Sequence, residues 1–431
     1  MRELKGDWRD LFNGFMVALD LRKCFLALCG IVVTIVLCGG MTIALGNWLN
    51  PPAVQPPSDL VLHNWWRTQC EAWHVIYQGK PLVALAYSVA FVLLFVAIWS
   101  YFGGAIARIA AYEVAKDGER IETRKALEFS RKKFWSFFWA PLICAIGFLF
   151  FAFCNYVGGL VGRVLDFIWI GAPLVALLLP LAILSGFIMT LILIGTFAGL
   201  PLFTPAVAAE GTDSFDAVSR GFSYVYSRPW QYLGYQIVGA AYGYVSIAFV
   251  ILFAIAMCHL GLEAGEEGFK LFGLLKSDTD FEDISNASWK LILSEAHRSP
   301  ATYAWDPLSI VADPSPYGRL QVLANQIVGV NYESAPALKS GHVVAHVLVT
   351  IWLAITLGLA LGYVVSYFIS QQTIIYYILR KKVDGIEMNE VFEEQEEEAK
   401  GTAPEPAPSS SAAPASAPPE KPSAPPQEEK K

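Results

Sequence analysis

Two histidines have the spacing most suggestive of chemistry in this sequence. His342 and His346 lie four residues apart, so both would project from one face of a helix, where a pair of imidazoles can bind a metal ion. No third ligand is adjacent in the chain, although His259, Asp313 or Glu333 could approach in space. Interfacial or core histidines explain the pair more simply, so the sequence predicts no metal site.

Patterns typical of enzymes are missing from the chain. There is no G-x-S-x-G elbow, no H-E-x-x-H helix and no C-x-x-C pair. The paired glycines Gly39-Gly40, Gly103-Gly104 and Gly158-Gly159 lie in or near apolar runs, which indicates close helix packing and not phosphate-binding loops. We therefore expect a protein that is not an enzyme, with no catalytic residue and no cofactor.

Few polar groups interrupt the apolar runs. Arg108 and Glu113 lie near the end of the second run, where a charge can mark a functional site. Arg108 can also place its guanidinium among lipid headgroups, and this anchoring role is the interpretation we favour. Deeper in the runs we note only Asn155, Thr190 and Thr196. A transporter normally needs more polar groups than these near the middle of the membrane.

Composition indicates a membrane protein. Hydrophobic residues make up 55% of the 431 residues and charged residues only 16%, whereas soluble domains have about 25% charged residues. Six apolar runs are long enough to cross a bilayer. They cover residues 24–46, 82–104, 134–157, 172–199, 232–258 and 343–379. The sequence therefore predicts an all-α polytopic membrane helical bundle.

The basic residues of the connectors predict the orientation. The 105–133 connector has eight Lys and Arg residues, whereas the 47–81 loop has two. Basic connectors stay in the cytoplasm, so both termini should be cytoplasmic. The net charge of −7 gives no reason to expect a nucleic-acid partner, and membrane lipids are the expected surroundings.

Five regions follow from these patterns. They are an interfacial amphipathic helix (1–23), five spans (24–258), an extracytoplasmic loop subdomain (259–342), the sixth span with a cytosolic extension (343–392) and an acidic, Pro/Ala/Ser-rich tail (393–431). The tail has too few large apolar groups to fold, so we expect it to be disordered, and a protein partner could bind there.

Two connectors share a pattern at a fixed offset of 93 residues. Ala115, Asp117-Gly118 and Phe129-Ser130 match Ala208, Glu210-Gly211 and Phe222-Ser223 without a gap. Both connectors face the same side, so the sequence predicts two parallel-repeat hairpins, 82–157 and 175–250, related by rotation about the membrane normal.

The second connector also resembles a known group of proteins. Its Pro205–Gly211 and Asp216–Ser223 segments with Trp230 are similar to a connector in uncharacterised bacterial membrane families, some of which resemble the membrane domain of certain glycerophosphodiester phosphodiesterases. Leu19–Lys23, Tyr376–Arg380 and Val383-Asp384-Gly385 resemble the planctomycete-type versions. The resemblance implies a multi-pass membrane fold and carries no catalytic residues. The function we expect is structural, assembly or interaction, and the alternative is transport of a small solute or lipid.

Overall fold

The computed structural model describes residues 6–49, 81–271, 285, 288–289 and 340–393. Within this part of the chain every regular element is a helix, which confirms the predicted all-α class. Six of these helices are long and apolar enough to cross a membrane. They are α2 (Leu21–Leu49), α4 (Pro81–Ala115), α6 (Phe134–Leu165), α7 (Gly171–Glu210), α9 (Pro229–Leu271) and α12 (Ser340–Val383). The shorter helices are η1 (Trp8–Asn13), α1 (Gly14–Ala18), α5 (Thr123–Lys132), η2 (Asp166–Ile168) and α8 (Ser214–Ser227).

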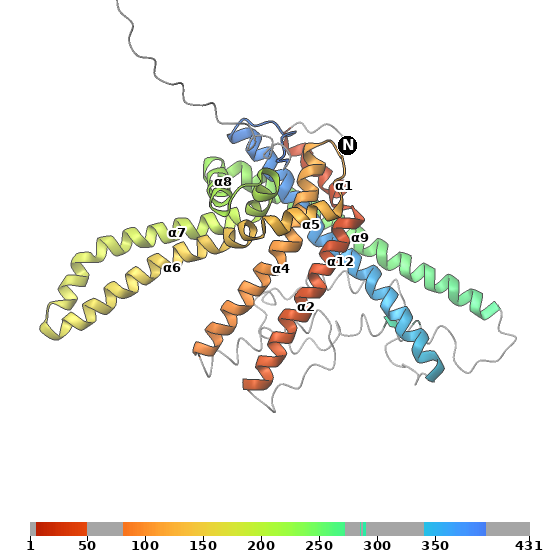
Figure 1. Ribbon diagram of the computed structural model, residues 1–431, viewed down its shortest axis with the longest axis horizontal. Helices are drawn as coiled ribbons and strands as arrows, with labels where there is room; N and C mark the ends of the chain where they lie inside the picture. The colour runs from red at the N-terminus through yellow and green to blue at the C-terminus, as the bar shows by residue number, and fades with distance from the viewer. Residues whose placement is uncertain (1–5, 50–80, 272–284, 286–287, 290–339, 394–431) are drawn as a thin grey trace, which may run out of the picture. The chain divides into compact units, whose positions relative to one another are not determined.

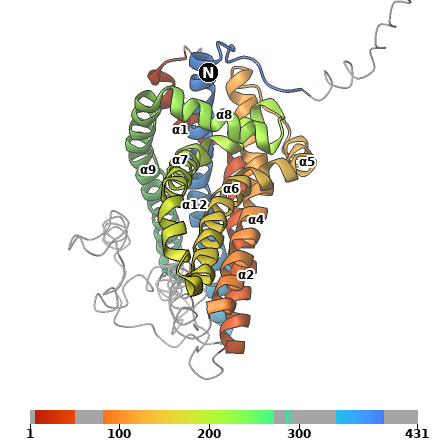
Figure 2. The same ribbon diagram turned by 90° about the vertical axis from the view of Figure 1, so that its left-hand side faces the viewer.

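The long helices pack as three pairs. α2 packs on α4, α6 on α7, and α9 on α12, as Figures 1 and 2 show. The C-terminal ends of α4, α7 and α12 contact one another at one end of the bundle. We call this end the cap. It comprises these three helix ends, the short helices η1, α1, α5 and α8, and the N-terminal ends of α2, α6 and α9.

One order of elements occurs three times in the fold. A long helix runs into the cap, a short helix crosses it, and a second long helix leaves it, as in α4–α5–α6 and α7–α8–α9. The third unit joins the two ends of the chain, because α12 packs on α1 and α2. The last helix of each unit packs on the first helix of the next, which closes the ring. The sequence predicted the first two units and missed the third; the superposition of 82–157 on 175–250 stays a prediction.

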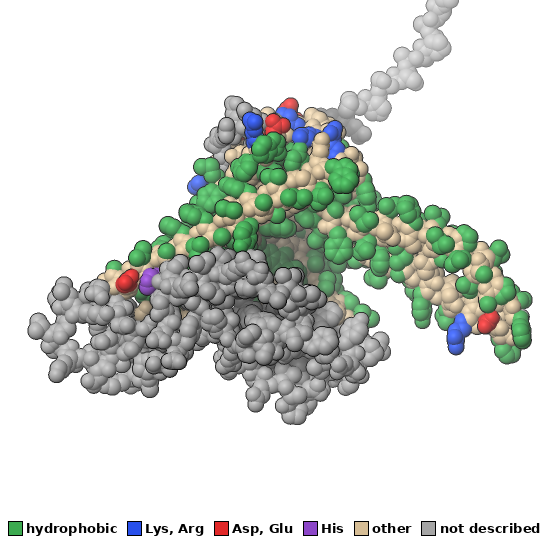
Figure 3. Space-filling model, turned by 180° about the vertical axis from the view of Figure 1, so that it is seen from behind, with side chains coloured by type: hydrophobic (Ala, Val, Ile, Leu, Met, Phe, Trp, Pro, Cys, Tyr) green, Lys and Arg blue, Asp and Glu red, His purple; other side chains and the backbone are tan. Residues whose placement is uncertain are grey.

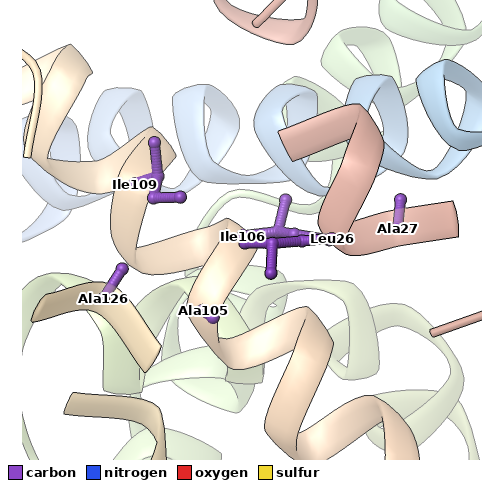
Figure 4. Packing of buried hydrophobic residues seen from close by; sticks show 6 residues of the cluster. All are labelled: Leu26, Ala27, Ala105, Ile106, Ile109 and Ala126. Atoms are coloured by element: carbon purple, nitrogen blue, oxygen red, sulfur yellow. The ribbon is translucent and has the colours of Figure 1, made fainter. Parts of the chain in front are cut away.

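Small residues let the helices approach closely beside the cap. One buried cluster joins three elements: α2 contributes Leu26 and Ala27, α4 contributes Ala105, Ile106 and Ile109, and α5 contributes Ala126 (Figure 4). Each of these side chains is at most 5% exposed. Alanine on α4 and α5 leaves room for the branched side chains between them, so the cluster fills the space at interior density.

Away from the cap, the long helices have apolar flanks that no described part of the chain covers. In the α6–α7 hairpin, Phe153 is 64% exposed and Leu181 is 63% exposed. Figure 3 shows hydrophobic side chains along such flanks. Apolar groups in these positions are stable against lipid chains and unstable against water, so the exposed flanks support a multi-pass membrane protein.

The glycine predictions were only partly correct. A Cβ at Gly104 would lie 2.8 Å from Phe137 and from Ser130, so this position does require close packing. A Cβ at Gly40, Gly158 or Gly159 would meet no atom of the described residues within 4 Å, so the predicted packing there was wrong. A much closer crossing occurs at Gly362, where a Cβ would lie 2.3 Å from the Cys24 carbonyl oxygen. The sequence analysis missed this contact between α12 and α2.

The predicted helix at the N-terminus is broken in two. η1 runs directly into α1, which ends at Ala18. After two residues α2 begins at Leu21, three residues before the start of the predicted span. Phe15 packs on Tyr363, while Trp8 stays 51% exposed. Most of the predicted extracytoplasmic subdomain and nearly all of the predicted tail lie outside the described residues.

Candidate functional site

Three hydrogen bonds connect the long helices that meet in the cap. Arg108 of α4 donates from Nη1 to the carbonyl oxygen of Ala208 in α7, at 2.8 Å. The Tyr376 hydroxyl of α12 donates to the carboxylate of Glu210 in α7. The Tyr377 hydroxyl of α12 donates to the carbonyl oxygen of Ala111 in α4, at 3.3 Å. Each pair of helices is thus joined once, so the contacts form a closed ring.

An acidic residue followed by glycine ends each of these three helices. Gly118, Gly211 and Gly385 have φ angles of 93°, 64° and 71°, in the left-handed region that glycine enters without steric cost. The Gly211 N–H donates to the Val207 carbonyl oxygen, which satisfies one of the free carbonyls at the end of α7. The dipeptide Asp384-Gly385 was therefore the signal in the sequence that could have identified the third unit.

A cluster of opposite charges surrounds the end of α7. Arg220 Nη1 lies 2.8 Å from Glu210 and 3.6 Å from Asp384. Arg380 Nε lies 3.4 Å from Glu210, close enough for an ion pair but without hydrogen-bond geometry. The Tyr224 hydroxyl donates to Asp384. Asp216 lies 3.6 Å from Arg220 Nε and Glu390 lies 3.7 Å from Arg380 Nη2, so each guanidinium group faces at least two carboxylates.

Two groups of this cluster have shifted pKa values. Burial disfavours the Arg220 cation, but the Glu210 carboxylate and the other surrounding groups together outweigh this effect and raise the pKa of Arg220. Burial and the hydrogen bond to Asp384 raise the pKa of Tyr224, so its hydroxyl stays protonated and donates. The contacts of this cluster join α7, α8 and α12.

Arg108 does not reach the headgroups, so the predicted anchoring role was wrong. Its side chain is buried at 4% exposure, and the guanidinium lies 4.2 Å from the centre of the Phe129 ring. The ring face and the Ala208 carbonyl oxygen together stabilise the cation inside the protein. Sequence alone could not show this, because both partners lie on other helices.

A buried ion pair joins α2 to α4. Lys23 Nζ lies 2.7 Å from Glu113 Oε2, with side-chain exposures of 0% and 6%. Asp20 and Arg22 form a second pair at 2.7 Å, in which Arg22 is 31% exposed. Burial disfavours ionised Asp20, but the hydrogen bonds from Arg22 outweigh it and lower the pKa of Asp20. The sequence placed Glu113 near Arg108 and missed Lys23 as its partner.

Polar side chains also line the contact between α9 and α12, which the sequence analysis did not anticipate. Gln236 and Gln372 donate to each other at 2.7 and 2.9 Å, and Tyr367 donates to the Gly239 carbonyl oxygen at 2.9 Å. Gln371 is 3% exposed, and neither its amide oxygen nor its amide nitrogen has a hydrogen-bond partner among the described residues. The run Ser370-Gln371-Gln372-Thr373 inside the sixth apolar segment was the signal for this seam.

The polar residues that the sequence analysis singled out are either more exposed than those of the cap or bonded to their own helix. Asn155 donates to Ser185 at 2.5 Å on the exposed part of the α6–α7 hairpin. Thr190 and Thr196 donate to carbonyl oxygens of their own helix, at 2.9 and 2.6 Å. The Asn155 contact joins α6 to α7, and the two threonine contacts stay within α7, so the three residues form no site together.

The histidine pair falls within α12, but the side chains of His342 and His346, like Asp313 and Glu333, lie outside the described residues. His259 lies 3.6 Å from Glu263 on its own helix. Among the described residues, no group of three His, Cys, Asp or Glu side chains is placed to hold a metal ion.

These contacts and the six apolar helices define a multi-pass, all-helical membrane protein. Comparison of the chain with protein-family models, with curated proteins and with solved structures found no match. The resemblance to planctomycete-type membrane families therefore stays a hypothesis drawn from the residues quoted above.

The segment after α12 folds back on the cap. Met388 is 5% exposed, and Arg380 Nη1 donates to the Glu390 carbonyl oxygen at 2.8 Å. Lys381 pairs with Glu387 at 2.9 Å. The glutamates of this extension thus meet basic residues of α12.

Truncation separates this extension from the tail. Ending the chain after Arg380 removes Met388, which is buried, and Asp384, which pairs with Arg220. We therefore expect the midpoint of thermal unfolding in detergent to fall by at least about 3 °C. Ending it after Lys400 should leave the midpoint unchanged, because Pro/Ala/Ser-rich sequence buries little apolar surface. Scanning fluorimetry compares the two chains, and equal midpoints would show that the extension contributes nothing to stability.

Proposed function

We propose that the protein is a non-enzymatic scaffold of a bacterial inner membrane, with a structural, assembly or interaction role. The observation that carries this proposal is the closed ring of hydrogen bonds through Arg108, Tyr376 and Tyr377 in the cap. Such a ring opposes relative movement of α4, α7 and α12, because any shift breaks at least two buried polar contacts. A rigid cap suits a protein that holds helices in place.

The charged groups of the cap support the same role. Arg220 and Arg380 pair with the surrounding carboxylates, including Glu210 and Asp384, and Lys23 pairs with Glu113. Charges that satisfy one another within the protein stabilise a shape and are not available to a substrate. We further propose that both termini lie in the cytoplasm, since the basic connector between α4 and α6 belongs to the cap.

Transport of a small solute or lipid is the second candidate, and one observation favours it. Gln371 is buried with both amide atoms unpaired among the described residues, beside Gly239 of α9 and Gly14 of α1. Buried polar groups in a membrane protein often mark a path for substrate, and an unsatisfied amide is costly unless something else uses it. A transporter would have to move α9 and α12 relative to the rest of the bundle.

The two candidates differ in how many conformations they require. Spin labels at Leu184→Cys in α7 and Leu348→Cys in α12, both exposed and in different units, report the separation of the helix pairs. The labels are placed in a chain without its native cysteines, reconstituted in nanodiscs. Double electron–electron resonance should then give one distance population for a scaffold. That population should persist when Gln371 is replaced by leucine.

A second label pair serves as the control. Lys125→Cys in α5 and Ser219→Cys in α8 lie on exposed positions of the cap, so their distance should stay fixed in either case. Two discrete populations for the first pair, with a ratio that Gln371→Leu changes while the cap pair is unaffected, would overturn the scaffold and support a transporter.

A further inference from the structure

The short helices of the first two units differ sharply in charge although they occupy equivalent places in the fold. Residues 119–133, which include α5, contain six basic and three acidic side chains, a net charge of +3. The equivalent residues 212–226, which include α8, contain one basic and two acidic side chains, a net charge of −1. The one basic residue there, Arg220, is held by Glu210. The shared fold therefore does not account for the charge on α5.

The basic residues of α5 lie on its outer face. Ala126, Phe129 and Ser130 are buried toward α4, and the Ser130 hydroxyl donates to the Tyr101 carbonyl oxygen at 2.6 Å. The four basic residues of the helix are exposed: Arg124, Lys125, Arg131 and Lys132. Positions 124 and 131 are two turns apart, and 125 and 132 likewise, so these four charges follow one side of the helix. The inner face thus fixes the helix. The outer face presents these four cations around one exposed carboxylate, Glu128, so it stays basic as a whole.

An aromatic cluster begins directly after these charges. Phe134, Trp135, Phe138 and Trp139 contact one another in the first turns of α6, with ring centroids 5.5 to 5.8 Å apart. Trp135 is 63% exposed and Trp139 is 40% exposed, one turn apart. Tryptophan at the start of a membrane span lies at the level of the headgroups. This depth brings the preceding basic residues beside the phosphate groups of the same leaflet.

We infer that the outer face of α5 with the start of α6 binds anionic phospholipid headgroups. The partner is fixed by charge complementarity and by the depth that the tryptophans set, since an anion at that level is a headgroup phosphate. The exposed cations nearest in the chain to the tryptophans are Arg131 and Lys132, since Lys133 is half-buried, and Arg124 and Lys125 extend the basic face by two turns. This inference does not depend on the proposed scaffold role, because either a scaffold or a transporter can recruit anionic lipid.

Native mass spectrometry of the full chain in a nonionic detergent can test the inference. Phosphatidylglycerol or phosphatidylcholine is added as the probe, and the ratio of the two apparent affinities is measured. The wild-type protein should prefer phosphatidylglycerol. In R131Q/K132Q that preference should fall by about fivefold for each charge removed, and it should fall further in R124Q/K125Q/R131Q/K132Q. The preference should also weaken as salt is raised, because the charges are exposed.

The matched control removes two exposed arginines from other parts of the cap. R9Q/R228Q changes η1 and the residue after α8 by the same total charge, and it should keep the preference of the wild type. An equal loss in this control would show that net charge alone acts, and would overturn the inference. So would an unchanged preference in the fourfold variant.

Two further measurements exclude other occupants of the basic face. Inorganic phosphate at millimolar concentration should not displace phosphatidylglycerol, and displacement would mean that the face binds a soluble anion. Removal of residues 393–431 should not raise the affinity, and an increase of several fold would mean that the acidic tail of this chain occupies the face instead.

Discussion

Replacing Lys23 with methionine is expected to lower the free energy of unfolding by about 3–5 kcal/mol, because Glu113 would remain as a buried carboxylate without its cation. Lys23 is fully buried, its Nζ lies 2.7 Å from Glu113 Oε2, and water cannot replace it easily. Unfolding of the purified protein in detergent, followed by scanning fluorimetry, should show a large fall in the midpoint.

Removing both charges should restore most of this loss. In Lys23→Met/Glu113→Leu neither side chain needs a charged partner, and a buried pair can often be replaced by apolar groups at little cost. The comparison variant is Lys381→Gln, which breaks the pair with Glu387. Because the side chains of Lys381 and Glu387 are 33% and 64% exposed, water compensates for the loss, and we expect at most about 1 kcal/mol. If Lys23→Met were as mild as Lys381→Gln, the Lys23–Glu113 pair would have no special role in joining α2 to α4.

The sequence predicted the positions of the helices well, but it did not predict which helices contact one another. The six spans follow from length and hydropathy, and the two connectors follow from matched residues at a fixed offset. Lys23 and Glu113 are 90 positions apart and lie in helices of different units, so no local pattern connects them. The third unit was missed for the same reason, since its helices stand at opposite ends of the chain.

Hydropathy also cannot separate the interior of this protein from its lipid-facing surface. Ala206 in α7 is fully buried in the cap, whereas Leu184 of the same helix is 54% exposed, and both are apolar. In a soluble protein the polar face of a helix indicates which side is outside, but lipid removes that signal. The informative residues are therefore the polar ones and the glycines, which a membrane helix retains where another chain segment meets them. Gln372 and Gly362 in α12 are such residues.

Gly362 gives the second large effect that we expect. A Cβ there would lie 2.3 Å from the carbonyl oxygen of Cys24, and backbone cannot move aside as a side chain can. Gly362→Ala should therefore lower the free energy of unfolding by about 1–3 kcal/mol, and Gly362→Val by more, because α12 and α2 must separate. Gly358, one turn earlier, faces the end of the flexible Leu28 side chain at 2.9 Å, so Gly358→Ala should cost less.

Glycines without a neighbour provide the control for this crossing. Among the described residues, a Cβ at Gly159 in α6 or at Gly261 in α9 would meet nothing within 4 Å. Alanine has the higher helix propensity, by about 1 kcal/mol, so Gly159→Ala and Gly261→Ala should leave the protein unchanged or slightly more stable. The sign of the change in the free energy of unfolding thus shows whether a Gly→Ala substitution acts through a steric clash or through helix propensity. A Gly362→Ala protein as stable as these controls would mean that α2 and α12 can cross at a greater distance, and that the third unit of the ring does not depend on this contact.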